Sequence, residues 1–206
     1  MSRLQLKPGK EKSLLRRHPW IYASAVGRID GNPGAGETVE VRGADGRFLA
    51  WAAYSPESSI RARAWSFAEG TCVTAELLAE RVRLAVQRRA ALASDTTAAR
   101  LVFGEAEGLP GLIVDRYADQ LVTQFQAAGV DAWRDVLIDA LLAASDVLVV
   151  SVPLTRATEG MIGARELGRM KPDAILVNLA RGEILDEAAL FAHLQATPGF
   201  TACIDA

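Results

Sequence analysis

The residues with the clearest chemical potential are cations placed to bind anions. Near the N-terminus, Lys10, Lys12, Arg16 and Arg17 lie close together in the sequence. Side chains of this kind neutralise the phosphates of a polyanion. Much further along, Arg181 stands at the carboxyl end of an apolar run that is typical of a buried strand, where an open α/β sheet places its ligands. The chain therefore offers two anion-binding candidates, and the elements around each decide what it could bind.

The charge of the chain is distributed unevenly. The 206 residues carry a net charge of −2. Residues 1–70 contain 11 Lys and Arg against 7 Asp and Glu, a net charge of +4, whereas residues 71–145 and 146–206 each have a net charge of −3. Only the first segment has the basic balance that favours a polyanion, although the same balance is also found on ordinary protein surfaces.

Aromatic residues follow the basic cluster and leave two interpretations open. The rings of Trp20 and Tyr22 could stack on unpaired bases. Alternatively, because they flank Ile21, they could anchor a core. His18 stands alone beside Pro19, and we expect it to be a surface or capping residue rather than a catalyst.

Short β-prone runs follow this cluster at Val39–Val41, Phe48–Trp51 and Ile60–Trp65, with glycine- and proline-rich turns between them. This spacing predicts a small barrel or sandwich. A single helical turn is expected over Ser13–Arg17, ended by Pro19.

Three stretches of this segment carry a family resemblance: KSLLRRHPWIYASAV, GETVEV and AYSPESSIRARAWSF. They resemble the PUA domain that opens the RlmI-like family of rRNA cytosine-C5 methyltransferases. The resemblance implies a compact β-barrel-like module and structured RNA (rRNA) as its partner. Carried onto this sequence, the RNA-contact candidates are Lys12, Arg16, Arg17 and Arg63.

The middle of the chain reads as an α+β region. An amphipathic helix is expected over Ala75–Ala93, then strands at Leu101–Phe103, Leu112–Tyr117 and Leu121–Phe125. A second helix is expected over Val130–Ala144. The run RLVFGEAEGLPGLIVDRYADQLVTQF resembles the small domain that connects the PUA and catalytic domains of the RlmI-like family.

The carboxylates in that run have two possible roles. Glu105, Glu107 and Asp115, beside Arg116, could share proton transfer. They also lie among glycines, where acidic loop residues are normal, and we favour that structural role. In the RlmI-like family a SAM-binding domain with a cysteine nucleophile follows; neither appears here, so we expect no SAM site and no RNA methylation by this chain alone.

The third segment predicts a parallel sheet. Apolar runs at Asp146–Val152, Ala174–Leu179 and Phe200–Ile204 are typical of strands buried on both faces. Helices are expected between them over Ala164–Met170 and Asp186–Gln195, with Asp186 as the N-cap. Strand–helix–strand order implies right-handed crossovers.

The run SDVLVVSVPLTRATEGMIGARELGRMKPDAILVNLARGEILDEAALFAHL resembles the NAD-binding domain of the D-isomer-specific 2-hydroxyacid dehydrogenases. The resemblance implies that Val152 and Pro153 line the cofactor cleft and that Arg181 grips the substrate carboxylate as the catalytic residue. It also implies that Asp205 lies beside the nicotinamide. The glycine loop G-x-G-x-x-G, which seats the pyrophosphate, is missing, and His193 does not occupy the position of the family's catalytic histidine. No cofactor is therefore expected to bind tightly, and NAD is implied by resemblance alone.

The predicted organisation is α+β followed by α/β: a PUA-like module over 1–70, a connecting α+β domain over 71–145 and half of a Rossmann-type sheet over 146–206. The join falls within 141–146, as in a chimera. The first strand of the half sheet has an open edge, which could self-associate or pair with Leu121–Phe125. RNA binding is the favoured function; a 2-hydroxyacid dehydrogenase fragment and a chain without present activity are the alternatives, and enzyme activity is left undecided.

The cysteines and the lengths of the apolar runs indicate where in the cell the chain is found. Cys72 and Cys203 have no metal-ligand spacing, so we expect two unpaired, buried thiols and no metal site. No apolar run is long enough to span a membrane, and a cytoplasmic location is expected.

Overall fold

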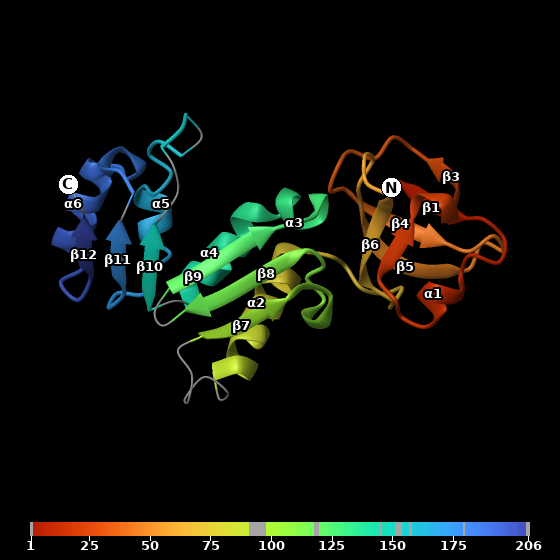
Figure 1. The fold of residues 1–206 in the computed structure, drawn as a ribbon, viewed down its shortest axis with the longest axis horizontal. Coiled ribbons are helices and arrows are strands. Elements are labelled where there is room, and N and C mark those ends of the chain that lie inside the picture. The colour runs from red at the N-terminus through yellow and green to blue at the C-terminus, as the bar shows by residue number, and fades with distance from the viewer. Residues whose placement is uncertain are drawn as a thin grey trace. The chain divides into compact units, whose positions relative to one another are not determined.

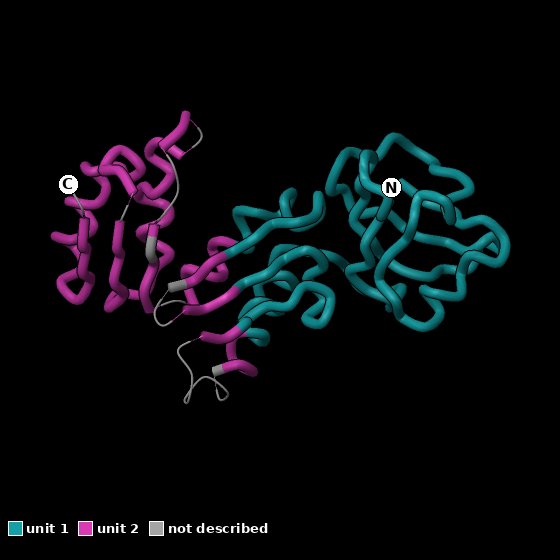
Figure 2. The backbone as a smooth tube through the Cα atoms, viewed as in Figure 1, with its two compact units in different colours: residues 1–85, 100–114, 123–137 teal, residues 86–99, 115–122, 138–206 magenta. Residues whose placement is uncertain are grey.

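The computed structural model describes residues 2–90, 98–117, 120–144, 146–150, 154–156, 158–178 and 180–204. Contacts between Cα atoms divide the chain into two compact units, which Figure 2 shows in different colours. Unit 1 contains residues 1–85, 100–114 and 123–137, and unit 2 contains residues 86–99, 115–122 and 138–206. The middle of the chain thus contributes residues to both units.

The N-terminal module is a curled six-stranded sheet, at the red end of the chain in Figure 1. Its strands follow the spatial order β2-β6-β5-β4-β1-β3. Their bounds are β1 Arg3–Leu6, β2 Trp20–Tyr22, β3 Val26–Asp30, β4 Thr38–Arg42, β5 Phe48–Tyr54 and β6 Ile60–Ser66. Neighbouring strands are antiparallel except β1 and β4, which are parallel. The expected barrel is therefore seen as a curled sheet with β2 and β3 at its edges.

Alternation along the strands builds the core of this module. In β1, Leu4 and Leu6 are buried while Arg3 is exposed, as the two-residue period of a strand requires. Leu14, from helix α1 (Lys12–Leu15), packs into the same core with Ile21 of β2. Helix α1 spans fewer residues than the predicted 13–17, and it ends well before Pro19.

Two glycines allow close packing within unit 1. Gly36 has a φ of +81°, and a Cβ there would lie 2.4 Å from the Ala132 Cβ. A Cβ on Gly129 would lie 2.4 Å from the Ala53 Cβ and 2.8 Å from the Trp65 ring. Helix α3 (Ala128–Ala132) therefore packs against the sheet at a distance that only glycine permits.

The middle region contains the predicted elements with shifted bounds. Helix α2 spans Ala75–Ala90, and residues 91–93 of the expected helix lie outside the described residues. A three-stranded sheet has the order β7-β8-β9. Its strands are β7 Ala98–Phe103, β8 Leu112–Tyr117 and β9 Gln120–Phe125. A 3-10 turn, η2 Gly104–Glu107, lies between β7 and β8, and the helices α3 and α4 (Arg134–Ala144) follow the sheet. The single helix expected over 130–144 is thus divided between α3 and α4.

The third segment forms a parallel sheet of order β10-β11-β12, blue in Figure 1. Its elements are β10 Val147–Val150, α5 Ala164–Leu167, β11 Ile175–Asn178, η3 Gly182–Ile184, α6 Glu187–Ala196 and β12 Thr201–Ile204. The predicted parallel pairing is confirmed. Strand β10 is an edge strand in this sheet and does not pair with β9, so the suggested pairing with Leu121–Phe125 was wrong.

One face of this sheet carries the core of the segment. Leu176 is fully buried, with Leu167 of α5 and Leu190 of α6 in the same cluster. The neighbouring β11 residue Ile175 points to the other face and is exposed. Cys203 lies on that second face as well and is free and exposed, as is Cys72, so the expectation of buried thiols was wrong.

Candidate functional site

Helix α1 ends in a Schellman turn that contains an arginine in the left-handed region. The His18 N–H donates to the Ser13 carbonyl at 2.9 Å, and the Arg17 N–H donates to the Leu14 carbonyl at 2.8 Å. This pair of hydrogen bonds places Arg17 at the C′ position, where glycine is usual. Arg17 has a φ of +60°, and no other non-glycine residue in the described part of the chain has a positive φ.

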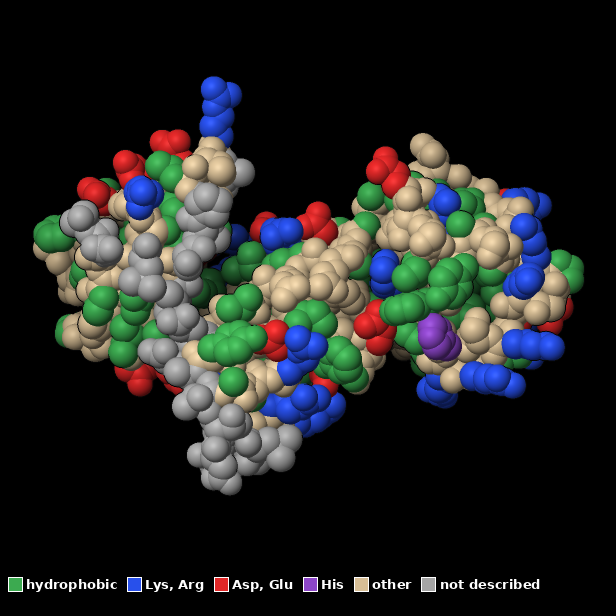
Figure 3. Space-filling view, viewed as in Figure 1, with side chains coloured by type: hydrophobic (Ala, Val, Ile, Leu, Met, Phe, Trp, Pro, Cys, Tyr) green, Lys and Arg blue, Asp and Glu red, His purple; other side chains and the backbone are tan. Residues whose placement is uncertain are grey.

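The turn displays its cations to solvent. Lys10, Lys12, Arg16 and Arg17 are all exposed, while Leu14 anchors the helix in the core. The Arg17 guanidinium carbon lies 6.0 Å from the centre of the Phe67 ring. Figure 3 shows Lys and Arg side chains gathered along one side of the N-terminal module. Three of the four predicted RNA-contact residues thus share one short turn.

Arg63, the fourth predicted contact, lies on β6 in a different environment. It is directly opposite Trp20 of β2 in the antiparallel pair. Its side chain is partly buried, and this burial lowers the pKa of the Arg63 guanidinium while the charge of Glu105 opposes the shift. Because arginine stays charged in proteins, Arg63 remains a cation.

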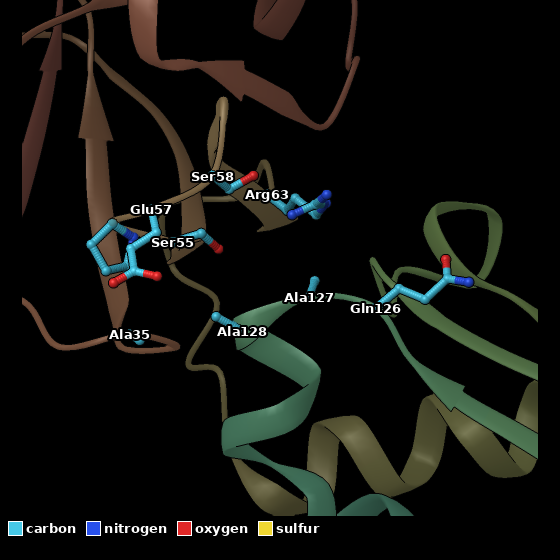
Figure 4. Close-up of a pocket in the computed structure, with 9 residues that line it drawn as sticks. Ala35, Ser55, Glu57, Ser58, Arg63, Gln126, Ala127 and Ala128 are labelled. Carbon is cyan, nitrogen blue, oxygen red and sulfur yellow. The ribbon is translucent and has the colours of Figure 1, made fainter.

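A pocket of about 350 Å³ in unit 1 includes Arg63. Figure 4 shows the Arg63 side chain extending from β6 into this space, opposite Ala127 and Ala128 at the start of α3. The other lining residues are Ala35, Ser55, Pro56, Glu57, Ser58 and Gln126. The recess has a largely apolar lining in which the Arg63 guanidinium and the Glu57 carboxylate are the two charged groups.

The aromatic residues near the turn were predicted either to stack on unpaired bases or to anchor the core, and their exposure differs. Ile21 is buried in the core, but Tyr22 is 47% exposed and is therefore no core anchor. Trp20 is partly buried, and its Nε1 donates a 2.7 Å hydrogen bond to Glu105 Oε1. His18 is exposed and its Nδ1 accepts a 3.3 Å hydrogen bond from the Trp20 N–H, which fits the predicted surface or capping role.

The carboxylates of the middle region have structural partners. Glu105 accepts the Trp20 hydrogen bond, and Glu107 accepts one from the Phe103 N–H at 2.8 Å. Arg81 of α2 donates to the Gly108 carbonyl at 2.6 Å, and burial lowers the pKa of the Arg81 guanidinium. These contacts hold the η2 loop in place and support the structural role over proton transfer.

Arg181 lies just beyond β11 in unit 2, at the carboxyl end of a parallel strand. The fully buried Asn178 fixes the chain there: its Nδ2 donates to the Arg181 carbonyl at 2.8 Å, and its Oδ1 accepts from the Ala180 N–H at 3.1 Å. The Arg181 side chain is exposed, and its Nη1 donates to the Ala180 carbonyl at 2.8 Å. This is the edge where open α/β sheets place their ligands.

The remaining dehydrogenase-like candidates, Val152, Pro153 and Asp205, lie outside the described residues. The glycines that precede this segment do not form a pyrophosphate cradle. Gly104 is the first residue of the η2 turn and Gly108 follows its last residue; the turn leads into strand β8 and not into a helix N-terminus. No hydride-transfer step is derived from the described residues.

Two further observations concern ligands and membranes. Among the described residues, no group of three or more His, Cys, Asp and Glu is arranged to hold a metal ion. None of the described helices is long and apolar enough to cross a membrane.

A PUA-like module followed by a parallel α/β segment defines the class of this chain, and comparisons with known proteins identify both parts. Residues 4–67 match the family described as PUA-like domain. Residues 102–206, about half of the chain, match the family described as D-isomer specific 2-hydroxyacid dehydrogenase, NAD binding domain. The chain belongs to this second family, and both resemblances predicted from the sequence are confirmed.

The curated relatives are methyltransferases. Ribosomal RNA large subunit methyltransferase I of Shewanella denitrificans is 43% identical over 142 residues, which cover 68% of this chain and 36% of that protein. The protein of the same name from Vibrio vulnificus is 38% identical over 185 residues, covering 84% of this chain and 45% of that protein. The chain thus spans between about a third and a half of the length of these relatives.

A solved structure shares the fold. A protein described as a SAM-dependent methyltransferase from Streptococcus mutans matches all of this chain and 71% of its own, with a TM-score of 0.61 and 13% identity. The fold is therefore mixed α/β and methyltransferase-like. The methyltransferase alignment and the dehydrogenase family match overlap along the chain. The alignment with the Vibrio vulnificus methyltransferase covers 84% of the chain and must therefore extend well past residue 146, into the residues that match the dehydrogenase family.

Sequence reasoning missed several contacts of this site. The Trp20–Glu105 hydrogen bond joins residues 85 positions apart, and no local pattern marks it. The left-handed conformation of Arg17 was also not predicted. The sequence held a signal for it, because the residues after the helix are Arg16, Arg17 and His18 and none of them is the glycine that usually occupies the C′ position.

Proposed function

We propose that this chain binds structured RNA through its N-terminal module, residues 1–70, with Lys12, Arg16, Arg17 and Arg63 as phosphate contacts. The observation that carries the proposal is the C-terminal turn of α1, which presents Lys12, Arg16 and Arg17 to solvent. The names of the curated relatives and the PUA-like match support it. Ribosomal RNA is the proposed target class.

The left-handed backbone conformation of Arg17 also supports RNA binding by this turn. A non-glycine residue at φ +60° is strained by about 1–2 kcal/mol relative to the right-handed region. Such strain is concentrated at functional sites, where the side chain has a task that glycine cannot perform. For Arg17, phosphate binding is the task that its charge and exposure fit.

Filter binding to structured rRNA fragments tests this proposal. The chain and an Arg16→Ala/Arg17→Ala variant would be compared at low and at moderate salt. Removing two phosphate contacts should lower the affinity and reduce the slope of log K against log [salt] by about 1.5–2. An affinity and slope unchanged in the variant would refute these residues as phosphate contacts.

We further propose that residues 71–145 form a connecting domain and residues 146–206 a partial NAD-binding segment of Rossmann type, joined near 141–146. The parallel order β10-β11-β12 supports this assignment. The open edge of β10 is the proposed surface for self-association. Sedimentation velocity of the whole chain should then show a dimer that forms as concentration rises; a monomer at every concentration would contradict the proposal.

A second candidate function is carboxylate binding at Arg181. The specific support is the pair of Asn178 hydrogen bonds, which hold the backbone of Arg181 at the carboxyl end of β11. Saturation-transfer NMR with a small 2-hydroxy acid, and separately with NADH, tests it. We expect saturation transfer from the unmodified chain to the 2-hydroxy acid and no transfer from the Arg181→Ala variant. If neither the 2-hydroxy acid nor NADH receives saturation from the unmodified chain, this function is refuted.

A further inference from the structure

Three aromatic rings form a row at the edge strand β2 of the N-terminal module: Trp20 and Tyr22 lie on the strand, and His18 lies just before it. His18, Trp20 and Tyr22 alternate in the sequence, and the intervening Ile21 enters the core. The His18 and Trp20 ring centres are 5.5 Å apart, and those of Trp20 and Tyr22 are 6.5 Å apart, both with edge-to-face geometry. Alternation along β2 places Trp20 and Tyr22 on the same side of the strand, and the His18 ring joins them through its contact with the Trp20 ring.

The row is exposed at both ends and fixed in the middle. Tyr22 is 47% exposed and His18 is exposed, whereas Trp20 is partly buried. The Trp20 indole is held by the 2.7 Å hydrogen bond to Glu105, and the His18 ring by the hydrogen bond from the Trp20 N–H. A ligand that stacks on the row would meet rings that are already oriented, which reduces the entropy lost on binding.

Cations border the row on both sides. Arg17 directly precedes His18, and Arg63 lies opposite Trp20 across the β2–β6 pair. Lys10 lines a small recess together with Trp20 and Tyr22. Figure 3 shows hydrophobic side chains gathered beside Lys and Arg side chains on this face of the module.

This interleaving matches the chemistry of a single-stranded nucleic acid. Successive bases stack on aromatic side chains while the cations follow the phosphates. Bases inside a duplex are already stacked and cannot reach such a row, so only unpaired nucleotides can use it. The structural alternative, in which the aromatic residues anchor the core, does not account for the exposure of Tyr22.

We propose that His18, Trp20 and Tyr22 form a stacking platform for unpaired RNA bases, with Tyr22 as its most accessible ring. The platform rests on the proposed function: the α1 turn and Arg63 bind phosphates, and the row selects RNA whose bases are unpaired at that position. The module therefore prefers a loop, bulge or single-stranded end to a continuous duplex.

The test uses the whole chain and two labelled RNAs of equal length, a perfect duplex and a hairpin with an unpaired loop. Three variants are compared by fluorescence anisotropy: Tyr22→Ala, Tyr22→Phe and, as a matched control, Tyr117→Ala. Tyr117 is a tyrosine of similar exposure, 52%, on β8. Because the Tyr22 side chain is exposed, these substitutions leave the core intact.

Tyr22→Ala should weaken hairpin binding by at least about fivefold, as expected for one lost base–ring stack, while duplex binding changes little. Tyr22→Phe, which keeps the ring, and Tyr117→Ala should both bind the hairpin like the unmodified chain. Equal loss of hairpin and duplex binding in Tyr22→Ala, or no loss at all, overturns the platform alone. An unmodified chain that binds neither RNA overturns the proposed function and the platform with it.

Discussion

Replacing Arg17 by glycine separates its structural from its functional contribution. Relief of the left-handed strain should stabilise the fold by about 1–2 kcal/mol. Greater freedom of glycine in the unfolded chain opposes this by about 0.4–1 kcal/mol. Loss of the 6.0 Å contact with Phe67 removes about 0.5 kcal/mol at an exposed site. The net result for Arg17→Gly is a stability between about 0.5 kcal/mol lower and about 1 kcal/mol higher than that of the unmodified chain.

Arg17→Ala is the matched control. It also removes the guanidinium, but its Cβ keeps the residue strained at φ +60°. The glycine variant should therefore be about 1 kcal/mol more stable than the alanine variant. Both variants should bind RNA about equally weakly, roughly fivefold to tenfold below the unmodified chain near 0.1 M salt, because each loses one phosphate contact.

Urea unfolding followed by circular dichroism gives the two stabilities, and anisotropy with one rRNA hairpin gives the affinities. A glycine variant less stable than the alanine variant would refute the left-handed conformation of residue 17. If the RNA affinities of Arg17→Gly and Arg17→Ala follow their stabilities, and do not follow the presence of the guanidinium, a direct role for Arg17 in binding is refuted.

Three other predictions concern the scaffold. Glu40 is buried against Arg42 and Arg3, and its hydrogen bonds to them hold the pKa of its carboxyl low, so Glu40→Gln should lose about 1–3 kcal/mol of unfolding free energy at pH 7. Since a lowered folded-state pKa stabilises only above the unfolded value of about 4.3, this difference should shrink as the pH falls below 4 in urea titrations. Glu105→Ala removes the Trp20 acceptor; it should cost about 1 kcal/mol and shift tryptophan emission, and unaltered emission would count against the 2.7 Å bond. Asp186→Ala should cost about 1 kcal/mol by thermal melting because the Asp186 carboxylate caps α6 through the Ala189 N–H at 3.0 Å, whereas Asp186→Asn should lose only a few tenths; equal losses would refute capping.

Much of the strand pattern could be predicted because it is locally encoded. β4, β5 and β6 are short β-prone runs bounded by turns, and the parallel strands β10 and β11 are nearly continuous apolar runs. β1 and β3 were not predicted. Each is short, and β1 is stabilised by pairing with residues of β3 and β4 that lie 20 or more positions away, which a local window does not detect.

Side-chain environment was harder to predict than side-chain type. The cations of α1 were recognised from composition, but Arg63 could not be placed beside Trp20 without the β2–β6 register. Cys203 was expected to be buried, but the structure places it on the exposed face of β12. Local alternation specifies two faces of a strand, and only tertiary packing decides which of them is covered.

Ultraviolet cross-linking of a structured rRNA fragment to the whole chain, followed by mass spectrometry of the RNA-linked peptides, tests the central claim most directly. We expect cross-links within residues 10–22 and around Arg63, weakened by Arg16→Ala/Arg17→Ala. Cross-links confined to residues 146–204, or a pattern unaffected by that double substitution, would contradict RNA binding by the N-terminal module.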